Sequence, residues 1–542
     1  MKISKIIIFA IVVGGFVLRL LPIEWGLPSK NLALSSYSPD EQVSFHSLEQ
    51  MNPKKLDFYP HQALDWGSLH IYLLGMTVKT AEILGAVKIG NREYYLHNLK
   101  ELDKLYMLGR LVPIIAGTIS IWLLYLIILN LFSDAATALL GSLLLAVIPV
   151  HLVYSFYVRP DALMILFGLC VIYFALRILE TGARKYYLIC GAFAGLTISA
   201  KYSGGACIVL PIVAHLLYLY RAKELTFGKI LGRNLQFGLL ALLGAFIITC
   251  PYCVTPVFPS HIRHLLSQAK GAPYNQPGWI AYLTYLLPTG MGWPLFLSSV
   301  AGCVGLAAAW RRDRDPKKIF LVFAGLGVYG IISSPKCPIT VYVMPVIPFL
   351  VIYSAYFLRT LWNAENKIVK QAGRLAVIFV VSYTTVYSLA YLNLFLEKNV
   401  REDASEWIEK NIPLGSSVAI ARSYFWTPPI LRRYDPPYKV LMGGDINSFL
   451  PDAVLGLGKV CEKADYLVLS EYEYREFVHP EIKEYFPEHS AIIDNIFSEK
   501  KFQKIVEFDR EASFLGLTFK KNYPPTDWLF PNPKIIVFKR KE

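Results

Sequence analysis

Two neighbouring carboxylates, Asp40 and Glu41, stand in the motif Ser38-Pro39-Asp40-Glu41, shortly after the first apolar segment of the chain. A carboxylate can take a proton from an attacking hydroxyl group. A pair of acids just beyond a membrane helix is therefore a candidate for chemistry at the membrane surface. The side of the membrane on which this chemistry takes place depends on the topology of the chain.

Three further groups of polar residues face the same outer surface in the topology derived below. They are Arg159-Pro160-Asp161, Lys201-Tyr202, and Lys336 with Tyr342 six residues later. Carboxylates with Lys and Arg at one lipid–water boundary suit an amphiphilic anion such as a lipid-linked phosphate, because positive groups stabilise a departing phosphate. Each group also has a structural interpretation. Pro and Asp are favoured at helix starts, and Lys201 and Arg19 can extend to the headgroups.

The elements that position these residues follow from the hydropathy pattern. The chain has 542 residues, is 54% hydrophobic and has a formal charge of +14, with a mean hydropathy of +0.42. Its basic residues cluster between apolar segments, which argues against nucleic acid as a partner. The pattern predicts a polytopic α-helical membrane protein with about eleven spans: 6–22, 111–131, 136–153, 160–179, 186–200, 204–220, 237–254, 285–309, 319–334, 339–358 and 375–396.

The loop charges predict the orientation of these spans. With the N-terminus inside, the later inner loops hold fifteen Lys and Arg residues and the short outer loops hold five, which are Arg159, Lys201, Arg263, Lys270 and Lys336. This asymmetry follows the positive-inside rule and places the C-terminal residues outside a plasma (cytoplasmic) membrane. The long first outer loop, 24–110, carries the two acids. Within it, 68–87 and 92–109 are predicted to be surface helices.

The composition changes after Leu396. Dense charges and short apolar runs predict a small extracytoplasmic α/β domain over 397–542, following a transmembrane module over 1–396. Helical stretches are expected at 402–411 and 472–477. The predicted strands are 417–421, 438–442, 465–470, 504–508 and 534–539.

An ordered set of motifs along nearly the whole chain resembles the GT-C superfamily of integral-membrane glycosyltransferases. The resemblance is strongest to the branch with protein O-mannosyltransferases and lipid A aminoarabinose transferases. Asp65-Trp66-Gly67-Ser68 stands where many members have His-Pro-Pro or Lys-Pro-Pro, so the resemblance does not name the sugar or the acceptor. The motifs are Arg19-Leu20, Asp40-Glu41, Gly67–Tyr72, Gly109–Leu111, Arg159–Asp161, Ala200–Gly204, Pro251-Tyr252, Lys336–Pro348, Ala404–Ile408 and Asn411–Gly415.

This resemblance implies transfer of a sugar from a polyprenyl-phosphate donor to a protein, lipid or glycan acceptor on the outer face, with inversion at the anomeric carbon. Asp40 would activate or orient the acceptor, with Glu41 and Asp161 positioning the acceptor or a divalent cation. A bound divalent cation is left open. The expected substrate-binding residues, for the lipid phosphate and the sugar, are Arg159, Lys201, Tyr202, Arg263, Lys336 and Tyr342.

Two other classes of function compete with this prediction. A lipid or sugar transporter would favour repeated halves and charges near the membrane midplane. The ionisable groups of this chain lie at span ends instead. A non-catalytic subunit could keep the same fold, but the intact Asp40-Glu41 pair argues against it.

Overall fold

The computed structural model describes residues 2–445 and 448–541. The chain forms two compact units. The helical unit comprises Met1–Ile23, Val43–Thr80 and Leu108–Leu389, and the C-terminal unit comprises Glu24–Gln42, Ala81–Met107 and Ala390–Glu542. The C-terminal unit thus includes two segments of the predicted first outer loop besides its last segment, Ala390–Glu542, and the division at 396 stays a prediction.

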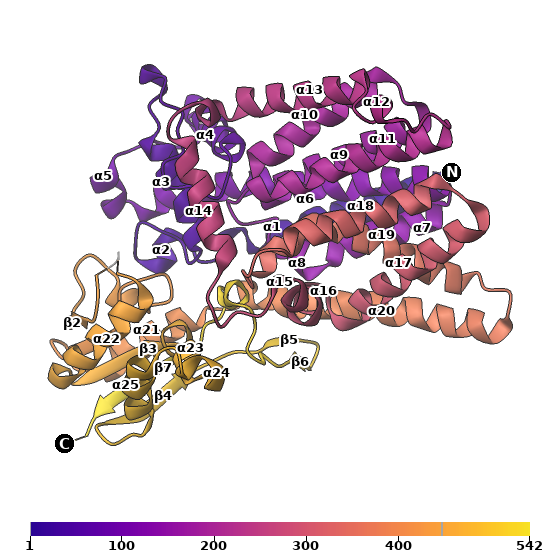
Figure 1. Ribbon diagram of the computed structural model, residues 1–542. Helices are drawn as coiled ribbons and strands as arrows, with labels where there is room; N and C mark the ends of the chain where they lie inside the picture. Colours follow the sequence, from indigo (N-terminus) through magenta and orange to yellow (C-terminus); the bar gives the residue numbers. More distant parts are fainter. Residues whose placement is uncertain (1, 446–447, 542) are drawn as a thin grey trace. The chain divides into compact units, whose positions relative to one another are not determined.

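Long apolar helices build the helical unit (Figure 1). Helix α10 packs against both α9 and α13, and α17 packs against α19. Gly191 and Gly195 of α10 lie so close to the backbone of α13 that a Cβ atom at either position would collide with it. Small residues four apart allow this close approach. The main helices are α1 (Lys2–Leu20), α6 (Leu99–Phe132), α7 (Ala135–Val147), α9 (Asp161–Thr181), α10 (Arg184–Ala200), α11 (Val209–Arg221), α13 (Arg233–Thr249), α17 (Trp293–Asp313), α18 (Pro316–Ile332), α19 (Ile347–Trp362) and α20 (Lys367–Leu396).

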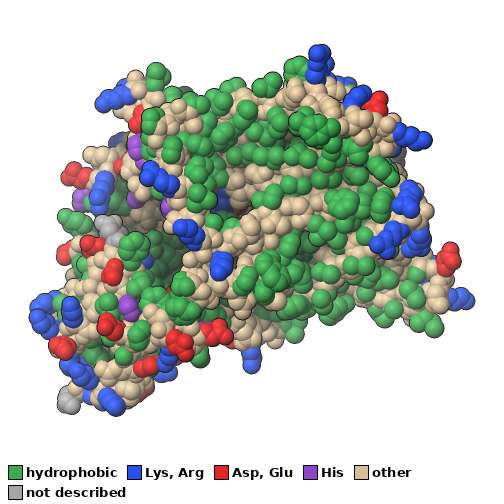
Figure 2. All heavy atoms as spheres, in the orientation of Figure 1, with side chains coloured by type: hydrophobic (Ala, Val, Ile, Leu, Met, Phe, Trp, Pro, Cys, Tyr) green, Lys and Arg blue, Asp and Glu red, His purple; other side chains and the backbone are tan. Residues whose placement is uncertain are grey.

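Each of the eleven predicted spans overlaps one of these helices, and eight helical segments among the described residues are long and apolar enough to cross a membrane. The helices α7, α10 and α18, with 13, 17 and 17 residues, are shorter than a typical span. Figure 2 shows hydrophobic side chains over the flanks of the long helices and Lys and Arg near their ends. A polytopic helical membrane protein is therefore confirmed, and the number of spans stays a prediction.

Of the two surface helices predicted for the first loop, the structure contains the first but not the second. Helix α4 (Leu69–Ile83) coincides with the first one, and at 15 residues it is not among the candidate spans. The second was wrong as a separate element. Residues 92–109 divide between α5 (Arg92–His97) and the first turns of α6, which runs on into the membrane segment. The apolar periodicity passes through Gly109 without a break, so the helix continues.

The C-terminal unit contains a five-stranded sheet with the order β2-β1-β3-β7-β4. Strand β1 is parallel to β2 and β3, whereas β7 is antiparallel to β3 and β4. All five predicted strands are present, and so are the helices expected near 402–411 and 472–477. The elements are β1 (Ser417–Ile420), β2 (Lys439–Met442), β3 (Tyr466–Ser470), β4 (Phe502–Phe508), β7 (Ile535–Arg540), α21 (Val400–Asn411), α22 (Leu450–Val460), α23 (Glu471–Val478) and α25 (Pro487–Phe497).

Alternate residues of the central strands pack on opposite faces of this sheet. Val418 and Val468 belong to a core with α21, whereas Ala419 and Leu467 belong to a second core with α22 and α25. Strands that are covered on both faces read as continuous apolar runs. This is why 465–470 and 534–539 were recognisable as strands in the sequence.

A small hairpin between β5 (Ala512–Phe514) and β6 (Leu517–Phe519) was not predicted from the sequence. Its turn residues, Leu515 and Gly516, both have positive φ angles of 50° and 78°. Turns of this kind usually carry Asn-Gly or Asp-Gly. With Leu at the first position, the usual sequence signal of the turn is absent.

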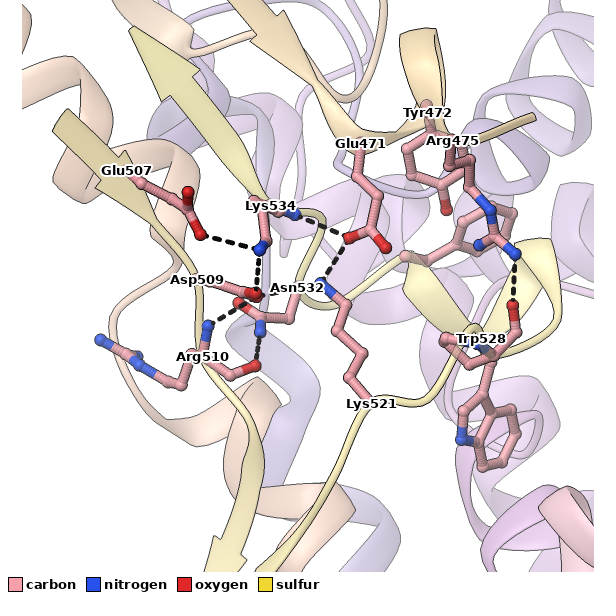
Figure 3. A network of polar contacts seen from close by, with 12 residues as sticks. Glu471, Tyr472, Arg475, Glu507, Asp509, Arg510, Lys521, Trp528, Asn532 and Lys534 are labelled. Carbon is pink, nitrogen blue, oxygen red and sulfur yellow. Dashed lines mark hydrogen bonds and ion pairs between the residues drawn. The ribbon is translucent and has the colours of Figure 1, made fainter. Parts of the chain in front are cut away.

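A network of ion pairs connects the loop before β7 to the sheet (Figure 3). Lys521 Nζ lies 2.6 Å from Glu471 and 3.1 Å from Asp509, and Lys534 Nζ lies 2.7 Å from Glu507 and 3.2 Å from Asp509. The network joins the start of α23, the end of β4 and the start of β7. A shared network of this kind holds a loop more firmly than isolated surface ion pairs do.

Candidate active site

The Asp-Glu motif forms the first turn of helix α3 (Pro39–Gln50). Pro39 suits the first position because its missing N–H has no partner there in any helix, and carboxylates are favoured by the helix dipole. Glu41 is completely buried and accepts a hydrogen bond from Ser36 Oγ at 2.6 Å, whereas Asp40 remains partly exposed. Asp40 is therefore the carboxylate that a substrate reaches more easily, a difference that the sequence did not reveal.

A buried ion cluster lies in the helical unit where α9 begins and α10 ends. Asp161 has no exposed surface, and its two oxygens pair with Lys201 Nζ at 2.7 Å and Arg159 Nε at 2.9 Å. Lys201 follows the last residue of α10, and its backbone also forms an isolated bridge with Trp66. Two cations thus share one carboxylate, and these three side chains together carry a formal charge of +1.

Two of the predicted tyrosines contact this region. Lys201 Nζ lies 5.0 Å from the centre of the Tyr342 ring, within cation–π distance. The Tyr202 hydroxyl lies 2.8 Å from that of Tyr252, which in turn donates to the carbonyl of Trp66 at 3.3 Å. The predicted residues Arg159, Asp161, Lys201, Tyr202 and Tyr342 are therefore gathered in the helical unit, directly or through Trp66.

Arg263 and Lys336 differ from the buried cations because both side chains are exposed. Arg263 lies on α14 (Phe258–Lys270), and the backbone N–H of Lys336 donates to Ala269 near the end of that helix at 3.0 Å. Neither side chain has an ion-pair partner among the described residues. Both cations are thus open to an anionic ligand from solution.

Histidine residues near these groups are hydrogen-bonded. His261 lies between Tyr59 Oη at 3.1 Å and the carbonyl of Leu64 at 3.0 Å, and His264 pairs with Asp65 at 2.9 Å. No group of three or more His, Cys, Asp or Glu side chains in the described ranges is arranged to hold a metal ion. Because both oxygens of Asp161 are occupied by cations, this carboxylate does not fit the expected metal ligand. A divalent cation at Asp40 and Glu41 stays open.

Two features of this region were not predicted from the sequence. The first is the contact of Trp66 with the cluster, which joins residues 135 positions apart in the chain. The second concerns Arg19, for which extension to the headgroups was one structural interpretation. It is fully buried instead, with Nη2 2.7 Å from His151 Nδ1 and Nη1 donating to the carbonyl of Gly15 at 2.8 Å. Polar partners inside the protein replace the headgroups for this side chain.

His70 provides a pH test of the packing around the cluster. It is completely buried, with Nε2 3.4 Å from Ser44 Oγ, and burial lowers its pKa to about 4; the Asp161 carboxylate opposes this shift and the Arg159 guanidinium adds to it. The unfolded chain therefore binds a proton below pH 6.5 that the folded chain does not. His70 therefore contributes to the free energy of unfolding through its neutral form. This contribution is complete above pH 6.5 and is lost as the pH falls towards 4.

We expect His70 to account for about 2 kcal/mol of the stability that the protein loses between pH 7.5 and pH 5. Unfolding of the detergent-solubilised protein at both pH values measures this loss. The His70→Gln variant should lose correspondingly less, and a His46→Gln control, at an exposed position, should behave as the wild type. Equal pH dependence of the wild type and His70→Gln would contradict the assignment.

Comparison with known proteins bears on both the fold and the buried cluster. The family model for dolichyl-phosphate-mannose-protein mannosyltransferases matches residues 104–253, a segment that includes Arg159, Asp161, Lys201 and Tyr202. No curated protein matches the chain. The structure of ArnT from Cupriavidus metallidurans bound to undecaprenyl phosphate is 14% identical, covers 98% of this chain and 97% of its own, and has a TM-score of 0.50.

Two structures of the Archaeoglobus fulgidus oligosaccharyltransferase are also similar. The apo form is 14% identical with a TM-score of 0.49, over 97% of this chain and 75% of that chain. The complex with Zn and sulfate is 15% identical with a TM-score of 0.48, over 95% and 72%. The likeness to ArnT shows that the chain shares the fold of that structure, and the predicted resemblance to GT-C glycosyltransferases is confirmed.

Proposed function

We propose that this protein is a glycosyltransferase that moves a sugar from a polyprenyl-phosphate donor to a protein, lipid or glycan acceptor on the outer face of the plasma membrane. The observation that supports it most is the buried cluster of Arg159, Asp161 and Lys201 within the segment that matches the mannosyltransferase family. An excess positive charge in a low-dielectric region attracts an anion strongly. The phosphate of a lipid-linked sugar is such an anion.

In the proposed reaction, the acceptor oxygen attacks the anomeric carbon as the bond from this carbon to the phosphate oxygen breaks. The proton of the acceptor hydroxyl passes to Asp40, and polyprenyl phosphate leaves with the electron pair of the broken bond. Direct displacement inverts the anomeric centre. The part exposure of Asp40 and the complete burial of Glu41 support Asp40 as the base and Glu41 as its structural neighbour.

The cations have two different roles in this proposal. Lys201 and Arg159 are held by Asp161 and supply a fixed positive potential, whereas the exposed Lys336 and Arg263 contact the phosphate. A preorganised positive potential stabilises the charge that develops on the leaving phosphate. Asp161 thereby positions the two cations, since its own oxygens are engaged with them.

The function is tested with purified protein in nanodiscs and a panel of radiolabelled polyprenyl-phosphate sugars. We expect release of the label from one donor, with transfer to an acceptor from a membrane extract. Net movement of donor across the bilayer without release would support a transporter instead. Binding of donor without release, in the presence of the extract, would support a non-catalytic subunit.

We expect Lys336→Ala to raise the KM for the lipid donor about tenfold, with kcat changed by less than about threefold. The reason is that the exposed Lys336 ammonium binds the phosphate equally well in the ground state and in the transition state, so its loss weakens donor binding without slowing the bound complex. Donor titrations of the wild type, Lys336→Ala and the exposed control Lys54→Ala measure this. A lower kcat with an unchanged KM would contradict a phosphate-binding role for Lys336.

A further inference from the structure

Arg432 of the C-terminal unit is bound to the segment that leads into Asp40 and Glu41. Its Nη1 donates to Asn31 Oδ1 at 2.7 Å, and its Nη2 donates to Ser35 Oγ at 3.2 Å. Both partners belong to the same unit as Arg432, although they lie about four hundred positions away in the chain. The planar guanidinium fork thus fixes two points of one short segment at once.

Hydrogen bonds connect Asn31 to the segment that carries the acidic motif. Its side-chain amide donates to the carbonyl of Ser35 at 2.6 Å and to that of Ser36 at 3.3 Å. Ser36 Oγ donates to Glu41 Oε2 at 2.6 Å and accepts from the backbone N–H of Ser38 at 3.1 Å. A continuous series of buried and partly buried hydrogen bonds therefore runs from Arg432 to Glu41, the residue next to Asp40.

A second contact holds the middle of the same segment. The Arg401 guanidinium lies 4.6 Å from the centre of the Tyr37 ring, and the Tyr37 hydroxyl donates to Glu402 Oε1 at 3.3 Å. Arg401 is fully buried and donates to Asn399 Oδ1 at 3.0 Å and to the carbonyl of Phe530 at 2.7 Å. Residues 31–41 are thus packed against α21 and the segment before β7.

The chemistry of Arg432 suits this orienting role. Its hydrogen-bond partners Asn31 and Ser35 supply neutral oxygens, and it forms no ion pair with a carboxylate among the described residues. Desolvation lowers the pKa of its guanidinium to about 10, so the side chain remains charged at neutral pH. Holding a partly buried cation without a carboxylate partner costs solvation free energy, and what the fold obtains from Arg432 is the defined geometry of its two hydrogen bonds.

We infer that Arg432 is a positioning residue for Asp40 and Glu41, acting through Asn31 and Ser35. The C-terminal domain thereby takes part in the transfer reaction, because it sets the geometry of the proposed base. This inference rests on the proposed function for its catalytic consequence. A misplacement of a reacting group by about 1 Å lowers a rate on the order of 100-fold.

The test uses Arg432→Ala, Arg432→Lys and the exposed neighbour variant Arg433→Ala in the full chain. We expect Arg432→Ala to lower kcat about 100-fold while the KM for the donor stays within about twofold. Arg432→Lys should recover part of the loss because lysine supplies a donor without the fork. Arg433→Ala should match the wild type. Hydrogen exchange over 31–41 should accelerate in Arg432→Ala and not in Arg433→Ala.

A double-mutant cycle with Asn31→Ala separates positioning from general destabilisation. Because both side chains act in one series of bonds, Asn31→Ala should reduce kcat little further once Arg432 is alanine. Additive losses, unchanged exchange over 31–41, or unchanged kcat in Arg432→Ala would overturn the inference. Absence of transfer by the wild type would refute the proposed function instead, and hydrogen exchange would then decide the positioning role by itself.

Discussion

Replacing Asp40 with asparagine should lower kcat for sugar transfer by about 10²- to 10⁴-fold, the usual contribution of a general base. Asparagine keeps the size of the side chain and its ability to accept a hydrogen bond, but it cannot take the acceptor's proton. Since Asp40 is only partly buried, the change should leave the fold intact. The KM for the lipid donor should change by less than about threefold.

The experiment compares initial rates for Asp40→Asn, Glu41→Gln and Glu49→Gln, all on helix α3. Glu49 is exposed and serves as the matched control for a lost carboxylate on the same helix. Glu41→Gln should reduce the rate less than Asp40→Asn, because glutamine still accepts the hydrogen bond from Ser36. A rate near that of the wild type in Asp40→Asn, with normal donor binding, would refute Asp40 as the base.

Replacing Asp161 with alanine should destabilise the protein by about 3–5 kcal/mol, the usual cost of leaving a buried charge uncompensated. The substitution leaves Arg159 and Lys201, which are 6% and 2% exposed, without their shared carboxylate. Thermal unfolding in detergent and the yield of folded protein measure the effect. Turnover should fall as well, because the two cations lose their fixed positions.

The control for Asp161→Ala is the double variant with Lys201→Met. Removing one of the two cations together with the carboxylate leaves less uncompensated charge, so part of the lost stability should return. The single variant Lys201→Met keeps the Arg159–Asp161 pair and should be destabilised less than Asp161→Ala. An Asp161→Ala protein that unfolds at the wild-type temperature would show that the cluster is not a buried ion network.

The strands of the C-terminal unit could be predicted because of how they are buried. Strands β3 and β7 are covered on both faces, so every residue of Tyr466–Ser470 is buried and the apolar run is visible in the sequence. Local patterns of this kind depend on neighbours within one element. The order β2-β1-β3-β7-β4 depends on crossovers between elements, and the hairpin at Leu515-Gly516 lacks the usual turn residues. Neither was predicted.

The candidate site likewise has features that the sequence shows and features that depend on contacts between distant residues. Asp40, Arg159, Asp161 and Lys201 were recognisable because residue type and position at span ends are properties of the sequence. The engagement of both Asp161 oxygens and the burial of Glu41 were not, since they depend on which side chains fill the space around them. Roles that depend on access or pairing therefore needed the structure.

The sequence by itself determined that the chain is a polytopic helical membrane protein, the approximate positions of its apolar helices and the candidate residues for its chemistry. Hydropathy and strand periodicity arise within segments of about twenty residues or fewer, and the chain displays them directly. The tertiary structure decided that Arg432 holds Asn31 and that Arg19 pairs with His151. Such contacts join distant residues by packing in three dimensions, and no periodicity along the chain encodes them.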